Sequence, residues 1–443
     1  MISEIKQRIT QLNNGEIPNG YEKTEFGIFP CDWVTDKRLK DIGTFGKGKG
    51  LPGEKMISEG VPCVGYGDIY MKYNNFHFEK AKSFVDKETA SESQPIQKGT
   101  LLFTGTGETA EEIGKCVCYN GDETIYAGGD IITFISNEVN PLFLAYQQYQ
   151  DFSLRNKASF GQGHSVVHIQ RENLEKLHVA YPKSTDEQSK IAEILMKWDE
   201  AIELYNQQIE KLKQLKSIYL KKMFPKNGER VPEWRFKGFT DAWEQCKLGE
   251  LGEFKSNGVD KLSKPNEHPV NLLNYMDIYN KRKITSKNCN ELMHVTAKSQ
   301  QIKDNNVVAN DVFFTPTSET ADDIGHVMVI EETLENTVYS YHLMRFRPFV
   351  GKLYKTFPNY GFATNSVRMQ MSLLAQGVQR FVLSKGQFES IKVALPKFEE
   401  QIKIAVFMGN FDNLITFHQS KVEKIKAQQK VLQKYLLNGI VRV

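Results

Sequence analysis

Apolar residues alternate at steps of four and three over two long stretches of the chain. In the first stretch these positions are Ile191, Leu195, Trp198, Ile202, Tyr205, Ile209, Leu212, Tyr219 and Met223. The alternation is typical of the heptad seam of a coiled-coil helix, and only Lys216 interrupts it. Thr185 followed by Gln188 predicts a capping box at the start, and Pro225 predicts the end. A helix over residues 187–224 would be about 57 Å long.

The second stretch repeats the pattern 213 positions later. Its apolar or seam positions are Ile404, Met408, Phe411, Ile415, His418, Val422, Ile425, Gln429, Leu432 and Leu436. Two of these seam residues are polar and Gly409 lies inside the helix, so we expect this helix to be the weaker one. Two heptad helices in one chain can pair, and antiparallel pairing would relate the flanking segments by an approximate twofold axis.

The first residues of the chain resemble the end of such a helix. Ile2, Ile5, Ile9 and Leu12 follow the same spacing, and the Asn-Gly-Glu of residues 14–16 recurs at residues 227–229. We therefore expect an N-terminal helix that docks beside the C-terminal one.

The segments before the two long helices are also repeated. GYGDIY at residues 65–70 recurs as NYMDIY at 274–279, and LLFTGTGETAEEIG at 101–114 recurs as VFFTPTSETADDIG at 312–325. The interval of about 210 residues is far longer than a solenoid repeat. The sequence therefore predicts a duplicated domain with two similar sites.

Each repeated domain has a mixed pattern, so we expect an α+β fold. β-rich runs bounded by Gly, Asn and Pro occupy residues 99–104, 130–135, 311–315 and 337–345, and residues 141–150 favour a helix. The expected organisation is an N-terminal helix (1–14), a first domain (15–184), a central helix (185–225), a second domain (226–397) and a C-terminal helix (398–443). Two pseudo-symmetric domains would thus be separated by two long antiparallel helices.

Bulk composition excludes several classes of protein. Of the 443 residues, 40% are hydrophobic and 25% are charged, which is a globular rather than a disordered composition. No apolar run is long enough to span a membrane, and the charged N-terminus is unlike a signal peptide. The six cysteines form no CxxC pair, which favours free thiols and a cytoplasmic location. The net charge of +3 permits basic patches for nucleic acid.

Candidate catalytic motifs are weak. GTFGKGKG at residues 43–50 approaches a P-loop, but Gly50 replaces the Ser or Thr that would hold magnesium, and the second repeat has GEFKSNG there. We interpret this segment as a flexible basic loop whose Lys47 and Lys49 contact phosphates. His164 and His168 have the spacing of a zinc helix, but their counterparts are Val378 and Val382, so we expect no metal site.

The sequence also lacks other catalytic signatures. It contains no arrangement of Ser, His and Asp or of Cys and His that suggests a nucleophile, and no Asn/Asp-Pro-Pro-aromatic motif of amino-methyltransferases. The paired acids in ETAEEIG and ETADDIG are more typical of loop charges than of a general acid and base. We therefore expect a chain with no catalytic activity of its own.

Polar, aromatic and basic residues occupy matching loops in both domains, where GQGHS at residues 161–165 aligns with AQGVQ at 375–379. Gln, Asn and Arg recognise base edges, whereas Lys, Ser and Thr hold phosphates. The residues predicted to contact DNA are Lys47, Lys49, Tyr66, Thr104, Thr106, Gln162, His164, Ser165, Tyr275, Thr315, Thr317, Gln376, Gln379 and Arg380. The alternative is that the tyrosines are core residues and the glycine-rich loops are simple turns.

In combination, these motifs resemble the specificity subunit of type I restriction-modification enzymes. The resemblance rests on PKSTDEQSKIA (182–192) and PKFEEQIKIA (396–405), on WDEAI (198–202) and FDNLI (411–415), and on VPEWRFKGFTDAWE (231–244). It implies that each domain is a target-recognition domain for one half of a split double-stranded DNA sequence. The helices would be spacers that dock two modification subunits, which use S-adenosylmethionine to methylate adenine N6.

The resemblance further implies restriction subunits that use ATP and magnesium, while this chain itself holds no cofactor. The helix residues expected to serve as spacer and partner surface are Ile191, Leu195, Trp198, Ile202, Ile209, Ile404, Met408, Phe411, Ile415 and Val422.

Three other interpretations remain open. A self-contained DNA-modifying enzyme would bind S-adenosylmethionine on its own. A coiled-coil scaffold for proteins would have no salt-dependent affinity for DNA. A specificity subunit of a methyltransferase-only or two-subunit restriction enzyme would have the same sequence features, because the motor is a separate chain.

Overall fold

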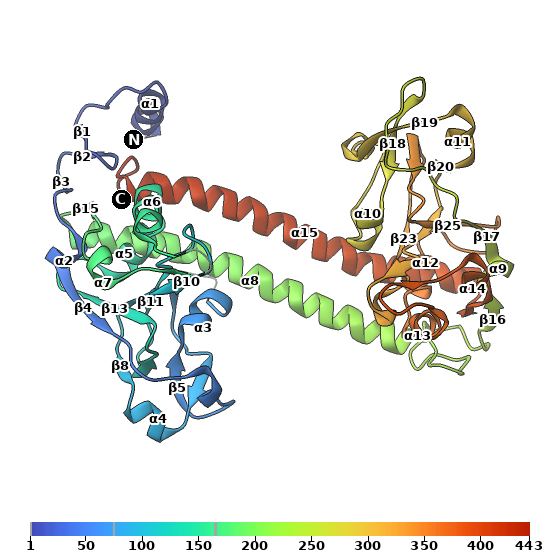
Figure 1. Ribbon diagram of the computed structural model, residues 1–443, viewed down its shortest axis with the longest axis horizontal. Coiled ribbons are helices and arrows are strands. Elements are labelled where there is room, and N and C mark those ends of the chain that lie inside the picture. The colour runs from blue at the N-terminus through green and yellow to red at the C-terminus, as the bar shows by residue number, and fades with distance from the viewer. Residues whose placement is uncertain (1, 74–75, 164–165) are drawn as a thin grey trace. The chain divides into compact units, whose positions relative to one another are not determined.

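The computed structural model describes residues 2–73, 76–163 and 166–443, and the chain divides into two compact units (Figure 1). Unit 1 comprises the chain up to Asn206 together with Ser420–Val443, and unit 2 comprises Gln207–Gln419. The boundaries fall inside the two long helices, α8 (Thr185–Met223, 39 residues) and α15 (Phe398–Leu437, 40 residues). Each unit therefore contains one globular part and a portion of both helices.

Unit 1 is built on two sheets. The five-stranded sheet has the order β4 (Gly43–Lys47), β13 (Ile131–Ser136), β9 (Thr100–Thr104), β11 (Cys116–Tyr119) and β6 (His77–Phe78). The four-stranded sheet has the order β7 (Ser83–Val85), β5 (Val61–Val64), β12 (Ile125–Ala127) and β8 (Gln94–Ile96). Two-stranded ladders join β1 (Tyr21–Lys23) to β2 (Ile28–Pro30), β3 (Trp33–Val34) to β15 (Tyr181–Pro182), and β10 (Thr106–Gly107) to β14 (Val167–His168).

Unit 1 also contains short helices, which precede, connect and follow the strands. They are α1 (Ile2–Asn13), α2 (Leu39–Ile42), α3 (Tyr66–Met71), α4 (Lys87–Ser91), α5 (Pro141–Gln147), α6 (Asp151–Phe160), α7 (Arg171–Leu174) and the 3-10 turn η1 (Gly53–Lys55).

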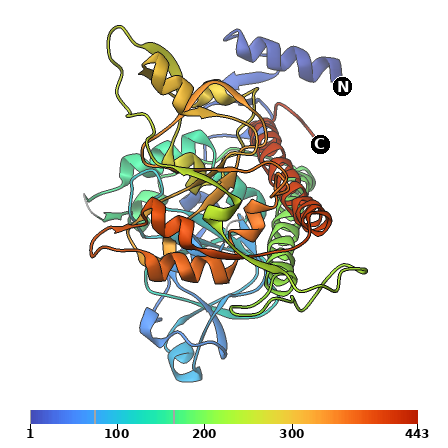
Figure 2. The same ribbon diagram turned by 90° about the vertical axis from the view of Figure 1, so that its right-hand side faces the viewer.

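Unit 2, whose elements run from yellow-green to orange in Figure 2, repeats this strand order except that β6 and the β1-β2 ladder have no counterpart in its described sheets. Its first sheet has the order β17 (Gly252–Lys255), β25 (Met344–Pro348), β21 (Val312–Phe314) and β23 (Val327–Val329). Its second sheet has the order β19 (Met293–Ala297), β18 (His268–Leu273), β24 (Leu334–Tyr339) and β20 (Asn306–Val307). The ladders β16 (Glu244–Lys247) with β27 (Lys392–Leu395) and β22 (Thr317–Ser318) with β26 (Phe381–Val382) match β3 with β15 and β10 with β14.

The helices of unit 2 follow in the same order as those of unit 1. They are α9 (Leu248–Leu251), α10 (Tyr275–Tyr279), α11 (Ser299–Asp304), α12 (Pro358–Gly361), α13 (Asn365–Leu374) and α14 (Lys385–Ser390), with the 3-10 turns η2 (Cys289–Glu291) and η3 (Ala321–Asp323). The shared order of strands and helices confirms the duplicated α+β domain.

Strands β9 and β21 are buried at every position and contain an unbroken apolar run, because both faces of their sheets are covered. In β9, Leu101 and Phe103 face the core beneath α5 and α8, and Leu102 faces the core shared with the second sheet. In β21, Phe313 likewise belongs to a different core from its two neighbours. Successive side chains of a strand point to opposite faces, so a doubly covered strand needs an unbroken apolar run.

Two sequence predictions need correction at the level of strands. The segment interpreted as a flexible basic loop begins as strand β4, in which Phe45 pairs with Phe134 of β13. The predicted run 337–345 covers the end of β24 and the start of β25, and the turn between them is closed by the Leu343 amide, which donates to the Ser340 carbonyl at 2.9 Å. The predicted runs 99–104, 130–135 and 311–315 correspond to β9, β13 and β21.

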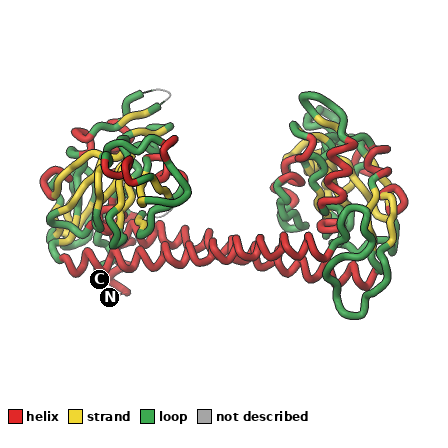
Figure 3. Tube along the Cα trace, turned by 90° about the horizontal axis from the view of Figure 1, so that it is seen from below, coloured by secondary structure: helices red, strands yellow, loops and turns green. Residues whose placement is uncertain are grey.

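The two long helices lie side by side (Figure 3), and their contacts within each unit show that they run antiparallel. In unit 1, Gln429 of α15 donates to Asp199 of α8 at 2.6 Å, while Arg442 beyond α15 reaches back to Glu187 near the start of α8. In unit 2, the Tyr219 ring of α8 lies against the rings of Phe407 and Phe411 of α15, at centroid distances of 4.9 and 5.6 Å.

The repeated Glu-Gln motif anchors the start of each long helix. Gln188 donates to the Pro182 carbonyl at 2.8 Å, and Gln401 donates to the Pro396 carbonyl at 3.1 Å. Arg235 holds the adjacent Glu400 through both carboxylate oxygens, at 2.9 and 2.6 Å. The motif therefore joins helix to domain. The predicted capping box at Thr185 is wrong, since the hydroxyl that accepts the Glu187 amide belongs to Ser184.

Helix α1 lies beside the C-terminal tail rather than on the seam of α15. Arg8 donates to the Ile440 carbonyl at 3.1 Å, and the Tyr21 hydroxyl donates to the Gly439 carbonyl at 2.5 Å. In unit 1 the beginning and the end of the chain are thus tied together by hydrogen bonds, whereas the corresponding connection of unit 2 is the covalent linker 224–243.

Candidate nucleic-acid interface

In unit 1, the described residues of a segment that we call tip 1 (162–163 and 166–168) lie beside strand β10. The backbones of Gln162 and His168 exchange two hydrogen bonds of 3.0 and 2.9 Å, and His168 also pairs with Thr106 of β10. The Thr106 hydroxyl lies 3.4 Å from Nδ1 of His168. The fold thus brings together Gln162 and Thr106, which lie far apart in the sequence.

Tyr70 of α3 holds the neighbouring loop in place. Its hydroxyl lies 2.8 Å from the Thr104 hydroxyl, 3.0 Å from the Thr106 carbonyl and 3.2 Å from the Glu112 carbonyl. The half-buried Tyr70 hydroxyl therefore holds residues 104, 106 and 112 of the TGTGETAEE segment around one point, beside tip 1.

Unit 2 presents the same arrangement as tip 2 (residues 376–382). The backbones of Gln376 and Val382 exchange hydrogen bonds of 3.0 and 2.9 Å, and Val382 pairs with Thr317 of β22. The Tyr275 hydroxyl donates to the Thr317 carbonyl at 2.8 Å. Gln376, Gln379 and Arg380 are all exposed at this tip.

Both tips require glycine at the same place. Gly163 and Gly377 have φ values of +128° and +142°, and a Cβ on either would lie 2.0 Å from a backbone carbonyl oxygen across the turn. An L side chain cannot occupy such a position without moving the turn. Both glycines therefore lie where the chain passes close to its own backbone, and Gln162 and residues 376–380 are exposed beside them.

The buried members of the predicted DNA-contacting set need correction. Thr104 and Thr315 are completely buried, and their hydroxyls bind Tyr70 and the His326 amide inside the domain. They shape the loops and do not reach a ligand. Tyr66 is exposed at the start of α3, whereas Tyr275 is only partly exposed. His164 and Ser165 lie outside the described residues.

Lys47 and Lys49 are exposed at the end of β4, next to the loop 128–130. The Lys49 amide donates to the Ala127 carbonyl at 3.0 Å, and the Gly105 amide donates to the Asp130 carbonyl at 2.9 Å. The Ile169 amide in turn donates to the Gly105 carbonyl at 3.0 Å. These backbone contacts link the basic segment to the loop that carries Thr106 and to tip 1.

Sequence reasoning missed a group of residues near tip 2. The pKa of His342 is lowered by burial and by the positive charges of Lys261 and Arg380, which places three basic side chains in one region. Tyr341 beside them is exposed. The signal was a Tyr-His pair in the turn that joins β24 of one sheet to β25 of the other, because connecting turns often carry ligand-binding residues.

The two aspartates of ETADDIG, Asp322 and Asp323, form hydrogen bonds with other residues of the same domain. Asp323 accepts from the Tyr279 hydroxyl at 3.1 Å and lies 2.8 Å from Nε2 of His326. The Asp322 carbonyl accepts from Arg368 at 2.6 Å. These contacts fix the loop beside tip 2, as the interpretation of these acids as loop charges predicted.

The sequence model of the family described as "Type I restriction modification DNA specificity domain" matches the chain twice, at residues 30–214 and 240–427. The chain belongs to this family. Specificity subunits of this kind contain two target-recognition domains, which are the globular parts of units 1 and 2.

Individual relatives agree with this assignment. A Methanocaldococcus jannaschii chain named for the specificity subunit of type I restriction enzyme MjaX is 23% identical over 441 residues, covering 96% of this chain and 97% of the relative. The MjaVIII specificity subunit of the same organism is 25% identical over 303 residues, covering 67% and 70%.

Solved structures share the fold. The crystal structure of a type I restriction-modification S subunit from M. genitalium has a TM-score of 0.60 at 16% identity and covers 95% of this chain and 97% of its own. A chain from a structural study of complex assembly and conformational transition in a type I system has a TM-score of 0.51 at 13% identity, with coverages of 96% and 100%.

The seam residues of this specificity subunit lie mainly in the interior. Ile191, Leu195, Ile202, Ile209, Ile404, Met408 and Val422 are buried, and Trp198, Phe411 and Ile415 are half-buried. They therefore hold the helices to each other and to the domains. The apolar side chains that α8 and α15 expose are others, among them Leu204, Ile218, Phe417 and Val431.

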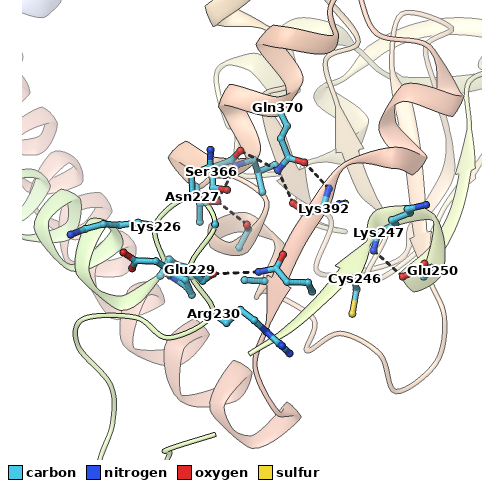
Figure 4. Close-up of a pocket in the computed structure, with 18 residues that line it drawn as sticks. Lys226, Asn227, Glu229, Arg230, Cys246, Lys247, Glu250, Ser366, Gln370 and Lys392 are labelled. Carbon is cyan, nitrogen blue, oxygen red and sulfur yellow. Dashed lines mark hydrogen bonds between the residues drawn. The ribbon is translucent and has the colours of Figure 1, made fainter. Parts of the chain in front are cut away.

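One cavity of about 510 Å³ in unit 2 lies at the linker (Figure 4). Its walls are the linker 224–230, β16, β27 and the first half of α13, and it contains none of the residues predicted to contact DNA. Gln370 bridges to Lys392 through two hydrogen bonds of 2.8 and 2.9 Å, and Gln245 donates to the Glu229 carbonyl at 3.4 Å. The Gln245 contact attaches the linker to the domain, and the Gln370 contacts join α13 to β27.

Within residues 2–73, 76–163 and 166–443, no three His, Cys, Asp or Glu side chains are grouped so that they could hold a metal ion. None of the helices in this part of the chain combines the length and apolar character that a membrane span needs.

Proposed function

We propose that this specificity subunit recognises a bipartite double-stranded DNA sequence, with tip 1 and tip 2 each contacting one half-site. The observation that carries the proposal is the matched pair of glycine-dependent tips, which present exposed polar side chains from the same place in two copies of one domain. Two equivalent recognition elements in one chain require two half-sites at a defined spacing, as in dimeric DNA-binding proteins.

The chemistry of tip 2 suits the major groove. Gln376 and Gln379 can form paired hydrogen bonds with adenine, and Arg380 can do so with guanine. Lys47 and Lys49 in unit 1 suit phosphate contacts, which position a protein without specifying sequence. Gln162, Thr106 and Tyr66 are the corresponding candidates for the first half-site.

We further propose that the long helices fix the half-site spacing and dock two modification subunits. Leu204 and Phe417 occupy equivalent positions of the two helices, as do Ile218 and Val431, and all four are exposed. Duplicated apolar positions suit two copies of the same partner. The partners would supply S-adenosylmethionine-dependent methylation of adenine N6 and, in a complete enzyme, ATP- and magnesium-dependent restriction, while this chain acts without catalysis.

The direct test is a base-resolution methylome of cells that carry this chain and its modification partners. Gln379→Ala and Arg380→Ala should change the methylated sequence or its occupancy in one half-site only. Lys237→Ala, an exposed lysine of the linker, is the control. An unchanged methylated motif and occupancy in both tip variants would remove tip 2 from the recognition surface.

The spacer role has its own test. Residues inserted into α8 between Glu210 and Ser217 should alter the number of unspecified bases between the half-sites or abolish activity, and should leave the half-site bases unchanged. A change in the recognised bases would contradict a purely mechanical role. The scaffold alternative predicts that DNA affinity does not fall with salt, whereas phosphate contacts make it fall steeply.

A further inference from the structure

A second cavity of unit 2, of about 590 Å³, is distinct from the tip and from the linker cavity. It lies between the loop 281–285 that follows α10, the end of β23, the segment 354–356 and the outer side of α15 from Ala405 to Thr416. We call it the lysine cavity. Its size is within the usual range for sites that hold small ligands or parts of larger ones.

The charges that line the lysine cavity are unbalanced. Lys216 is paired with Asp412, and Arg282 is paired with Asp277 and Glu291. In the described part of the chain, the other three cations that line the cavity form no ion pair; they are Lys281, Lys283 and Lys355. The carboxylates in the lining are Glu331, Glu332 and Asp412, and Glu332 also accepts from the amide and hydroxyl of Ser286. Five cationic side chains of the described lining thus face three carboxylates, so positive charge is in excess.

Lys281 is exposed to solvent, as are Lys283 and Lys355, but its ammonium group has other cations nearby. Its backbone has a left-handed φ of +50°, a conformation that L residues other than Asn and Asp seldom adopt. The pKa of its ammonium group is lowered by desolvation and by the nearby charges of Lys216 and Arg368, against which Asp412 is the opposing group. Cations gathered in this way are stabilised when an anion binds among them.

Gly409, in the interior of helix α15, lines the cavity and leaves room in it because it has no side chain. Gly409 of α15 would tolerate a side chain, since an added Cβ would have only the Tyr360 hydroxyl nearby, at 3.7 Å. Glycine in a helix interior costs about 1 kcal/mol relative to alanine. The equivalent position of α8 in unit 1 is Met196, whose side chain packs against the core. Unit 2 thus lacks a stabilising side chain at the place where the cavity needs room.

Uncharged donors complete the lining. Asn410, Asn413 and Thr416 line the cavity from the exposed side of α15, and within the described residues their side chains form no hydrogen bond. Amides and hydroxyls next to lysines are the usual partners of phosphate oxygens.

We propose that the lysine cavity binds a phosphate group, and that this group belongs to the DNA backbone beside the second half-site. The assignment to DNA rests on the proposed function. It is favoured because Lys281 follows directly on α10, whose Tyr275 supports the loop next to tip 2. A free polyphosphate, such as that of a nucleotide, shares the same chemistry and is the other source.

The test uses the specificity subunit assembled with its modification partners. DNA affinity is measured by fluorescence anisotropy over a range of salt for wild type, Lys281→Ala, Lys281→Ala with Lys283→Ala, and Gly409→Met, with Lys237→Ala as control. Loss of one phosphate contact should lower the slope of log affinity against log salt by about 0.9 and the affinity several-fold. The loss should be equal on specific and unrelated DNA, with the methylated motif unchanged.

Gly409→Met tests whether the free volume of the cavity is needed for DNA binding, independently of its charge. It introduces the residue that unit 1 has at the equivalent position, Met196, and leaves all lysines in place. It should reproduce the loss of affinity seen with Lys281→Ala. Because the substitution restores a good helix former, a loss of affinity with it cannot be attributed to a weaker helix.

A second arm distinguishes the sources of phosphate. Inorganic tripolyphosphate is added, and the melting temperature of wild type is compared with that of the double lysine variant. Stabilisation of wild type alone, with unchanged salt slopes for DNA, would keep the phosphate site and overturn its assignment to DNA. Unchanged slopes and no stabilisation would overturn the site itself. If wild type showed no preference for any DNA sequence, the proposed function would fail, and the tripolyphosphate result would still decide the cavity.

Discussion

Units 1 and 2 have an aspartate at equivalent positions of their long helices, but its hydrogen-bond partners differ between the two units. In unit 1, Asp199 is buried and accepts from the Tyr146 hydroxyl at 2.5 Å and from the Gln429 amide at 2.6 Å. In unit 2, the equivalent Asp412 accepts from the Tyr360 hydroxyl at 2.8 Å and from Lys216, and it is partly exposed. Lys216 and Gln429 stand 213 positions apart, so they are equivalent residues of the two helices.

The difference follows from exposure to water. A buried ion pair must overcome the desolvation of both charges, whereas a partly exposed pair keeps much of its hydration. The buried site uses neutral donors and the exposed one uses a cation. The pKa of Asp199 is accordingly raised, chiefly by burial, while the hydrogen bonds from Tyr146 and Gln429 oppose the shift.

A second contrast concerns a buried cation. Lys157 of α6 is completely enclosed, and its ammonium group donates to the Gly114 carbonyl at 3.0 Å below the loop of unit 1. Unit 2 has Met371 in the corresponding place, where its sulfur lies against Gly325. Burial lowers the pKa of Lys157 to about 8. One unit therefore supports its loop with a polar contact, and the other supports it with apolar packing.

The largest expected effect comes from removing the aspartates. Asp199→Ala leaves the Tyr146 hydroxyl and the Gln429 amide buried without a partner, so it should lower the free energy of unfolding by about 3–5 kcal/mol. Asp412→Ala should cost about 1–2 kcal/mol, since the Lys216 ammonium can turn toward water. Urea unfolding of both variants checks this. Equal losses would mean that exposure does not explain the difference.

Replacing Lys157 with the residue of unit 2 should raise stability. Lys157→Met removes the cost of burying an ammonium group and should raise the free energy of unfolding by about 2 kcal/mol at neutral pH. The folded-state pKa of about 8 lies below the ordinary value of 10.5, so the unfolded chain binds more protons between these values. Wild-type stability should therefore rise with pH across this window relative to the variant.

The control for this prediction is the reverse exchange. Met371→Lys should destabilise unit 2 at neutral pH and introduce the same dependence on pH there. Thermal melting at several pH values from 7 to 10.5 measures both variants. A constant difference between wild type and Lys157→Met over the whole range would show that the lysine does not change its charge on unfolding.

A smaller effect is expected from Asp199→Asn, which keeps the shape and removes the charge. The raised folded-state pKa of Asp199 means that its contribution to stability falls as pH rises from 3.8 through the folded pKa, and is constant above it. Relative to wild type, the variant should become more stable with rising pH by about 1 kcal/mol. Asp412→Asn is the matched control, because it removes the charge from the equivalent position of unit 2.

The smallest expected difference in stability is between a glycine of the C-terminal tail in unit 1 and a glycine of the linker in unit 2. Gly439 has a φ of +65°, and a Cβ there would lie 2.5 Å from Pro30, whereas Gly228 has a φ of +82° and open space around it. Gly228→Ala should cost about 1 kcal/mol from backbone strain alone. Gly439→Ala should cost more, because it also displaces the C-terminal tail. Hydrogen exchange at Ile440 in the two variants would detect a displaced tail, and equal exchange would contradict it.

Much of the fold was predictable because its signals are local or repeated. The heptad steps from Ile191 to Met223 indicate a long helix whatever surrounds it, since periodicity is a property of consecutive residues. The recurrence of ETAEEIG as ETADDIG indicates a duplicated domain without any coordinate. The candidate site was predictable only in outline, because its glycines mark turns while the exposure of each neighbour depends on distant segments.

Tertiary structure alone decided the role of each polar residue. Lys216 and Gln429 appeared as defects in an apolar seam, and only the approach of Asp412 and Asp199 from the opposite helix makes them partners. Thr104 lies in a polar loop of the sequence, but Tyr70 covers it. The sequence by itself determined the repeat, the helices and the turns, because these depend on neighbouring residues. Burial and charge pairing depend on what the folded chain places opposite each side chain.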